Sequence, residues 1–289
     1  MKLGLGTAQW GLKYGIANQK GITPPETVAM LLNAAQRSGI EVLDTATLYG
    51  KSEAVLGENK LDGFKVVTKT PYFSSSHITN VEINQLRDTF HHSLSLLAVN
   101  KTYGILVHHA NNLLSPGGEK LLEALLKLKE EGLVQKIGVS VYDSNQIDAI
   151  LKIFTPDLIQ LPLSVFDQRM LESGHLELLK NLNVEIHVRS VFLQGLLLMA
   201  MRDVPKYFQP IHPLLVRWHI AAKEQGFTTH QAAIAFVKNI SSVDTVLVGL
   251  DSLSQFQSCI ESFSLNRVFD ASGLACNDSV FINPSLWKI

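Results

Sequence analysis

Four side chains of complementary chemistry, an acid, a phenol, an amine and an imidazole, follow one another within residues 44–108. Asp44, Lys69 and His108 each close a short apolar run, and Tyr49 follows Asp44 by five residues. A carboxylate paired with Lys69 would hold the amine charged, and a nearby cation is expected to lower the pKa of a phenol. The set predicts proton transfer to a carbonyl oxygen, with Tyr49 as general acid, Asp44 and Lys69 tuning it, and His108 orienting the substrate.

Each of the four also has a purely structural explanation: a turn acid, a surface aromatic, a solvated strand-end amine and a core histidine. His109 is a rival for the role of His108. Strand alternation puts His108 on the face that carries Leu106 and His109 on the opposite face. The prediction therefore depends on the order of the four along successive segments and not on any one of them.

The elements that must position these residues alternate along the chain as short β-rich runs and amphipathic segments. Strands are expected at residues 3–7, 41–44, 64–69, 103–108, 135–140, 157–161, 184–189 and 243–249. Helices are expected at residues 25–38, 52–59, 79–97, 118–131, 144–153, 174–182, 212–239 (broken near Gly226) and 252–263. Eight such pairs predict an α/β fold, a (β/α)8 TIM barrel with eight parallel strands, in which the C-terminal strand ends share one face.

A Rossmann domain is not expected. Gly4-Leu5-Gly6 opens like a dinucleotide fingerprint, but Gln9 stands where the third glycine belongs, and no long helix follows. We expect one domain over residues 1–289, with residues 264–289 as a C-terminal tail over one end of the barrel. The helix at 25–38 is expected to be capped by Thr23, with Glu26 completing the capping box.

Composition narrows the class of protein further. The chain has 289 residues, 46% of them hydrophobic, and a net charge of −1. Without a basic stripe, nucleic-acid binding is not expected. The longest apolar stretch, 191–201, is interrupted and too short to span a bilayer. The two cysteines form no motif, and the N-terminus does not read as a secretory leader. We expect a cytoplasmic protein that acts on a small molecule, without a metal; nothing in the sequence indicates an oligomeric state.

Several segments carry a more specific pattern. They are Leu5 to Gly11, Leu43 to Ala46 followed by Tyr49-Gly50, Ser52-Glu53 and Leu56-Gly57, then Thr68-Lys69 and Leu106 to His108. On these segments the chain resembles the aldo-keto reductase family, as a bacterial-type, single-domain member, over nearly its whole length. The resemblance implies a barrel that binds a nicotinamide cofactor across its C-terminal mouth. Hydride would pass to the carbonyl carbon while Tyr49 protonates the oxygen.

The resemblance also implies a set of cofactor contacts along the chain. Ser140 and Gln160 match the residues that hold the nicotinamide carboxamide, and the segment 190–195 matches the loop along the pyrophosphate. The full set is Gly6, Thr7, Ala8, Asp44, Ser140, Gln160, Arg189, Ser190, Phe192, Gln194, Gly195, Gly249, Asp251 and Gln255.

Two positions depart from the family pattern. Many members have an aromatic residue that stacks on the nicotinamide where this chain has Arg189. A guanidinium there would disfavour the oxidised pyridinium, grip an anionic substrate bidentately, or serve only as a salt-bridged barrel-end arginine. Relatives that prefer NADP carry Lys or Arg near the 2′-phosphate, whereas this chain has Asp251. NADP(H) is the cofactor expected from the family, with NAD(H) as the alternative.

The sequence leaves three functions open. The leading hypothesis is an NAD(P)H-dependent enzyme that reduces an aldehyde or ketone to an alcohol; His109, Asn111 and Asn112 hint at a sugar-like substrate. The second is a non-catalytic barrel that senses a cofactor or binds a partner. The third is a lyase or isomerase that uses Lys69 as a Schiff base.

Overall fold

Eight parallel strands close a barrel in the computed structural model, which describes residues 1–288. Each strand pairs with the next in sequence, and the eighth pairs with the first through Leu5 and Val248. The predicted fold is therefore confirmed, with strand ends that differ by one or two residues. The strands are β1 Lys2–Gly6, β2 Val42–Asp44, β3 Lys65–Lys69, β4 Thr102–Val107, β5 Val134–Ser140, β6 Leu158–Pro162, β7 Glu185–Arg189 and β8 Thr245–Gly249.

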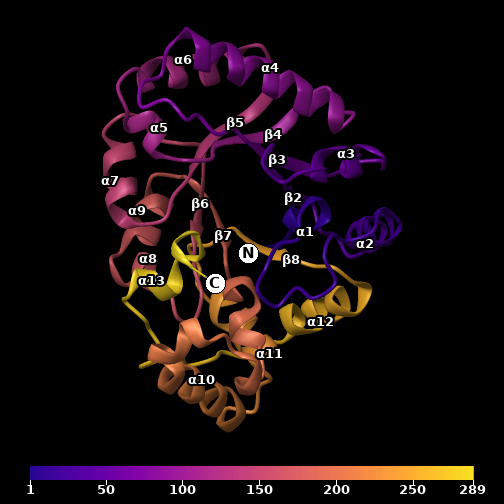
Figure 1. Cartoon of the computed structure of the whole chain (residues 1–289), viewed down its shortest axis with the longest axis vertical. Helices are drawn as coiled ribbons and strands as arrows, with labels where there is room; N and C mark the ends of the chain where they lie inside the picture. Colours follow the sequence, from indigo (N-terminus) through magenta and orange to yellow (C-terminus); the bar gives the residue numbers. More distant parts are fainter. Residues whose placement is uncertain (289) are drawn as a thin grey trace.

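Helices surround this barrel (Figure 1). Those expected from the sequence are α2 Pro25–Arg37, α3 Ser52–Gly57, α4 Asn80–Leu96, α6 Gly118–Glu130, α7 Ser144–Leu151, α9 His175–Asn181, α10 His212–Glu224, α11 Thr229–Lys238 and α12 Leu253–Ser264. Short helices that the periodicity did not predict are α1 Ala8–Gly11, α5 Asn111–Leu114, α8 Arg169–Glu172, η1 Leu193–Leu198, η2 Met201–Asp203, η3 Lys206–Ile211, α13 Ser279–Ile282 and η4 Pro284–Leu286.

The start of α2 differs from the prediction. Pro24 is the N-cap residue, and no side chain caps the helix. Thr23 is instead 2% exposed, its backbone N–H donates to the carbonyl of Gln9 at 2.9 Å, and its hydroxyl has no partner within the described chain. The Thr23 cap is therefore wrong, because a cap must immediately precede the first helical residue and Pro24 takes that place.

The inside of the barrel is packed solid. Val67, Leu106 and Leu158 form a separate apolar cluster there. A Cβ added at Gly138 would lie 1.8 Å from the carbonyl oxygen of Leu158 and 2.7 Å from Cδ2 of Leu106, so only glycine fits. Since the interior has no room for a ligand, any reaction has to take place at an end of the barrel.

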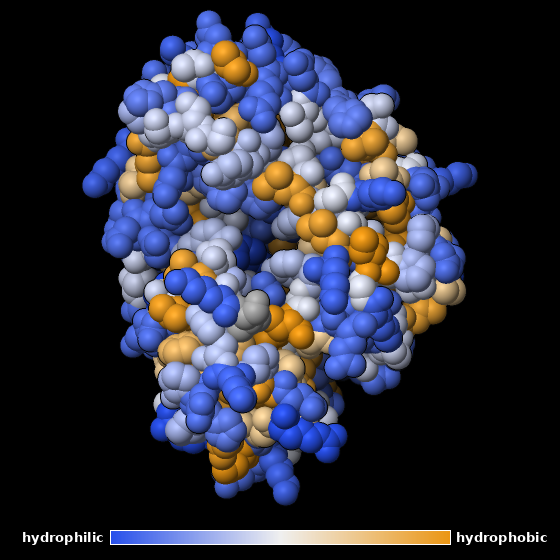
Figure 2. Space-filling view, in the orientation of Figure 1, coloured by the Kyte–Doolittle hydropathy of each residue, from blue (hydrophilic) through white to orange (hydrophobic). Residues whose placement is uncertain are grey.

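The chain beyond α12 folds back onto the loops that follow β6 and β7. The backbone N–H of Cys276 donates to the carbonyl of Phe166 at 2.8 Å, and the rings of Phe208 and Trp287 meet edge to face at 4.9 Å. Figure 2 shows the molecule hollowed near its centre, with hydrophilic residues at the bottom and apolar ones on part of the rim. In residues 1–288, no helix has the length and apolarity needed to cross a membrane.

Candidate active site

A buried ion pair joins β2 and β3 at the C-terminal end of the barrel. Nζ of Lys69 lies 2.8 and 2.9 Å from the two carboxylate oxygens of Asp44 and 2.8 Å from the carbonyl of Thr45. Lys69 is 1% exposed and Asp44 is 5% exposed. Burial lowers the pKa of Lys69, and the Asp44 carboxylate opposes that shift. An ammonium has three N–H groups, and all three have acceptors here.

Tyr49 lies directly over this pair. Nζ of Lys69 is 4.9 Å from the centre of the Tyr49 ring. Burial, and then the charge of Asp44, raise the pKa of Tyr49 above its ordinary value, while Arg189 lowers it. The expected lowering by Lys69 is therefore not what the structure shows, because Asp44 balances the lysine charge and the phenol is shielded from water. Tyr49 keeps its proton throughout the neutral range.

His108 follows β4 and completes the cluster. Its ring meets the Tyr49 ring edge to face with centres 6.1 Å apart and stacks on His109 at 5.1 Å. Burial, and then the positive charge of Lys69, lower the pKa of His108 to about 2. The imidazole is therefore neutral at working pH, with one N–H to donate. The four residues predicted from the sequence lie together in the structure.

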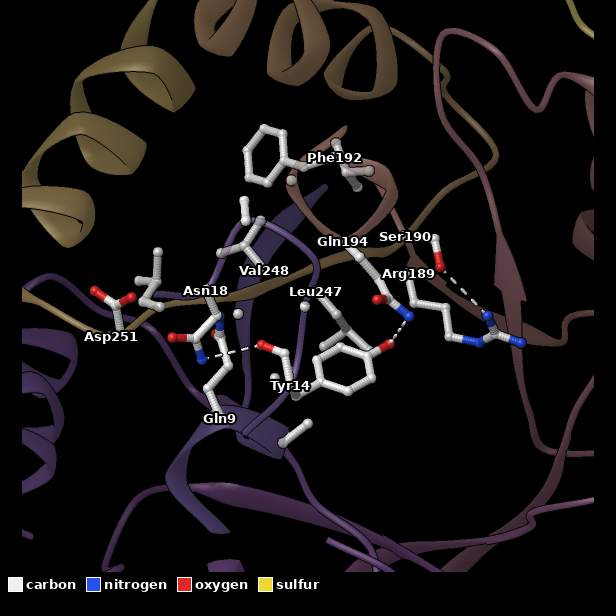
Figure 3. A pocket seen from close by; sticks show the side chains of 18 of the residues that line it. Gln9, Tyr14, Asn18, Arg189, Ser190, Phe192, Gln194, Leu247, Val248 and Asp251 are labelled. Carbon is white, nitrogen blue, oxygen red and sulfur yellow. Dashed lines mark hydrogen bonds between the residues drawn. The ribbon is translucent and has the colours of Figure 1, made fainter. Parts of the chain in front are cut away.

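A cleft of about 250 Å³ extends from this cluster across the barrel mouth (Figure 3). Its walls are the loop after β1, the segment after β7 and the end of β8. Of the residues predicted to bind a cofactor, those that line the cleft are Gly6, Ala8, Asp44, Arg189, Ser190, Phe192, Gln194, Gly195, Gly249, Asp251 and Gln255.

Three predicted cofactor residues do not reach the cleft. Thr7 is fully buried, and its hydroxyl donates to the backbone carbonyl of Asp44 at 3.0 Å. Ser140 is 3% exposed at the end of β5. Gln160 is 1% exposed and donates from Nε2 to Oδ1 of Asp44 at 2.6 Å, and its amide oxygen accepts no hydrogen bond from residues 1–288. Thr7 and Gln160 therefore hold Asp44 in place in this structure.

The segment after β7 has an unusual backbone. Ser190, Leu193 and Gln194 have φ values of 65, 45 and 54 degrees, a region that non-glycine residues avoid. Gly195 follows with φ of 95 degrees, and a Cβ there would lie 2.4 Å from Cβ of Ala17. Such strain tends to gather where a backbone is shaped to hold a ligand.

Several cleft residues were not predicted. Gln9, Tyr14, Asn18 and His230 line it. Nε2 of Gln194 donates to the Tyr14 hydroxyl at 3.5 Å, so the loop after β1 meets the segment after β7 across the cleft (Figure 3). The only signal for the loop after β1 in the sequence was its glycines. Glycines indicate turns, but they do not predict which residues a loop will contact. His230 stacks on Phe192 at 4.9 Å.

Asp251 lies at the far end of the cleft from Arg189 (Figure 3). Its Oδ1 is buried and accepts no hydrogen bond within the described part of the chain. Nζ of Lys20 is 3.8 Å away on a side chain that is 72% exposed. The Asp251 backbone N–H donates to Oε1 of Gln255 at 2.9 Å. A buried carboxylate with a free acceptor suits a hydroxyl group and opposes a phosphate.

The residues that suggested a sugar-like substrate lie outside this cleft. Oδ1 of Asn111 accepts from Nε2 of Gln146 at 3.0 Å. Oδ1 of Asn112 is buried without a partner among residues 1–288. The His109 ring stacks on the His108 ring and meets the Tyr72 ring edge to face, with ring centres 5.4 Å apart.

Comparisons with known proteins agree with this fold. Residues 2–279 match the family model described as Aldo/keto reductase family. The chain is 25% identical to an NADH-specific methylglyoxal reductase of Escherichia coli, over 92% of this chain and 90% of that protein. Two structures of similar fold are the holo form of aldo-keto reductase AKR11C1 from Bacillus halodurans and the glycerol dehydrogenase AKR11B4 from Gluconobacter oxydans. The first has a TM-score of 0.73 at 19% identity and covers 92% of this chain and 88% of its own. The second has a TM-score of 0.70 at 21% identity, over 92% and 87%.

The protein is a parallel eight-stranded barrel with an acid, a phenol, an amine and an imidazole at its mouth. The chain belongs to the aldo/keto reductase family. It is accordingly an enzyme that reduces carbonyl compounds with a nicotinamide cofactor.

Proposed function

We propose that Tyr49 is the general acid of this enzyme and that an aldehyde or ketone is reduced beside it to an alcohol. The observation that carries the proposal is the contact of three groups: the Tyr49 ring, the Lys69 ammonium 4.9 Å from its centre, and the His108 ring 6.1 Å away. Asp44 and Tyr49 both line the cleft, whereas Lys69 lies behind them.

A nicotinamide cofactor held in the cleft would supply the hydride for this reaction. Tyr49 holds a proton at its hydroxyl oxygen and gives it to the carbonyl oxygen as charge develops there. The Arg189 charge favours the phenolate that remains, because it lowers the pKa of Tyr49 against the effects of burial and Asp44, while Asp44 holds the Lys69 ammonium 4.9 Å from the centre of the ring. His108, neutral and with a single N–H, orients the carbonyl oxygen by a hydrogen bond.

The cleft fits a dinucleotide cofactor, and we propose NADH as the preferred one. Two buried acceptors, Oε1 of Gln9 and Oδ1 of Asp251, lack hydrogen-bond donors within residues 1–288. Ribose hydroxyls would supply them, whereas the 2′-phosphate of NADPH would place negative charge against Asp251. Residues 190–195 would hold the pyrophosphate. The proposal thus takes NADH over the NADP(H) expected from the family pattern, in line with an E. coli relative that is NADH-specific.

The Schiff-base hypothesis fits the geometry poorly. Lys69 donates its three N–H groups to Asp44 and to the carbonyl of Thr45, and it does not line the cleft. A lysine nucleophile needs a neutral amine that faces the substrate.

Replacement of Tyr49 by Phe tests the function. We expect kcat to fall roughly 10²–10⁴-fold, the usual contribution of a general acid, with NADH binding unchanged. The matched control is Tyr103→Phe. Like Tyr49, Tyr103 has lysine ammonium groups near its ring, with Nζ of Lys65 and Nζ of Lys136 at 5.5 and 5.3 Å from the ring centre, but it lies near the opposite end of the barrel. Full activity in Tyr49→Phe would refute the assignment. Nucleotide binding without turnover of any carbonyl by the wild type would favour the non-catalytic hypothesis.

A further inference from the structure

Arg189 crosses the barrel mouth from one strand to another. It ends β7, where it pairs with Pro162 of β6, and its Nη2 donates to the carbonyl of Val141 beyond β5 at 3.2 Å. Its guanidinium carbon lies 4.3 Å from the centre of the Tyr142 ring. Stacking on that ring fixes the plane of the guanidinium.

Among residues 1–288, the charge of Arg189 has no counterion. Within residues 1–288, no carboxylate lies within 4 Å of its nitrogens, and its hydrogen bonds go to neutral acceptors: Val141 at 3.2 Å and the Ser190 hydroxyl at 3.3 Å. Arg169 nearby shows the contrast, with both oxygens of Asp167 at 2.8 Å. Both contacts of Arg189 are longer than usual for N–H···O bonds, and a guanidinium has five N–H groups to satisfy.

This unpaired charge acts on the space around Tyr49. Arg189 and Tyr49 line the same cleft. The Arg189 charge opposes the rise in the pKa of Tyr49 and adds to the lowering of the pKa of His108, so it acts on both side chains proposed to meet the carbonyl oxygen. Lys69 and Arg169, two further cations at this end, are paired with Asp44 and Asp167. Within the described part of the chain, Arg189 is thus the one Lys or Arg that lines the cleft, and its positive charge is uncompensated.

We propose that Arg189 binds a carboxylate on the carbonyl substrate, so that the enzyme selects oxo acids and carboxyl-bearing aldehydes. The proposal rests on the proposed function and adds a substrate class to it. A carboxylate matches the flat fork of a guanidinium with two parallel hydrogen bonds. It would also offset the cost of a half-buried charge that has only neutral acceptors. The cofactor pyrophosphate is a second source of negative charge, and the experiment separates the two.

The test compares two nearly isosteric aldehydes, 4-formylbenzoate and the neutral 4-formylbenzamide, together with their 2- and 3-isomers to vary the spacing. The proteins are the wild type, Arg189→Gln, Arg189→Lys and the control Arg202→Gln. Arg202 suits as a control because its side chain is 88% exposed. We measure kcat and KM with NADH, and by calorimetry the binding of NADH, of ADP-ribose, and of benzoate to the NADH complex. Thermal melting shows that each variant is folded.

We expect the wild type to favour at least one formylbenzoate over its amide, and Arg189→Gln to lose roughly tenfold or more of that preference, through KM. Arg189→Lys should restore part of it, because lysine keeps the charge without the fork. Benzoate binding should be lost in Arg189→Gln, with NADH binding unchanged. Arg202→Gln should match the wild type.

Two results would overturn the assignment. One is an equal loss of activity in Arg189→Gln for the carboxylate and the amide substrate. The other is weaker binding of NADH and ADP-ribose by Arg189→Gln with an unchanged substrate preference, which would show that Arg189 binds the cofactor pyrophosphate. If the wild type reduced neither aldehyde, the proposed function would be at fault, and benzoate binding would still decide the role of Arg189.

Discussion

The side-chain amide of Gln160 donates a 2.6 Å hydrogen bond to Oδ1 of Asp44, the same oxygen that accepts from Lys69. Three strands, β2, β3 and β6, therefore meet in one buried network. The resemblance assigned Gln160 to the cofactor carboxamide. In the structure one of its two N–H groups is taken by Asp44, and its amide oxygen accepts no hydrogen bond from residues 1–288.

Removal of this amide should destabilise the protein. We expect Gln160→Leu to lower the free energy of unfolding by about 1.5–3 kcal/mol, because a buried carboxylate loses a hydrogen-bond donor. Urea denaturation measures the change. Gln36→Leu is the control, since Gln36 is exposed and makes one 3.3 Å bond to the carbonyl of Asp62. Equal effects of the two changes would show that the Gln160–Asp44 bond contributes nothing specific.

The choice between NADH and NADPH should depend on Asp251. We expect Asp251→Ser to tighten NADPH binding relative to NADH by roughly tenfold, because the repulsion of the 2′-phosphate disappears while a hydroxyl remains. Fluorescence titration with both nucleotides at low and high salt measures the ratio. Asp203→Ser serves as the control, because Asp203 is exposed. An unchanged ratio in Asp251→Ser would remove Asp251 from the cofactor site.

Acid should destabilise the protein through His108. Its pKa falls from about 6.5 in the unfolded chain to about 2 in the folded protein. The unfolded state therefore binds the proton first, and stability is lost as the pH falls from about 6.5 toward 2, by at most about 1.4 kcal/mol per pH unit. Relative to the wild type, His108→Gln should gain stability at pH 5 compared with pH 7.5, measured by urea unfolding. The exposed His77 provides the control His77→Gln, which should show no such gain.

The contact between the two loops that wall the cleft should depend on Gly195. We expect Gly195→Ala to weaken NADH binding about tenfold. The added methyl group would clash with Ala17 and destabilise the loop conformation that binds NADH by about 1.4 kcal/mol. Gly174→Ala is a matched control, because Gly174 also has a positive φ, 76 degrees, but nothing lies within 4 Å of its Cβ position. Both changes introduce backbone strain; only the first should alter NADH binding, as read by fluorescence titration. Equal Kd values would contradict the role of this contact.

The barrel could be predicted because its signals are local. A short apolar run indicates a strand, and a 3.6-residue period indicates a helix, whatever lies elsewhere in the chain. The convergence of Asp44, Lys69 and His108 then follows, since parallel strands bring their C-terminal ends to one face. The short helices after β7 have no such period, and the Thr23 cap failed by a single position.

The sequence by itself determined the fold, the family and the order of the four residues at the barrel mouth. Only the tertiary structure decided their environment. Gln160 meets Asp44 across 116 residues of sequence, and Tyr14 meets Gln194 across 180. The raised pKa of Tyr49 and the unpaired charge of Arg189 depend on burial and on charges from several strands at once. These properties are set only when the barrel closes, because the groups that determine them come from several strands and no local segment of the sequence contains them all.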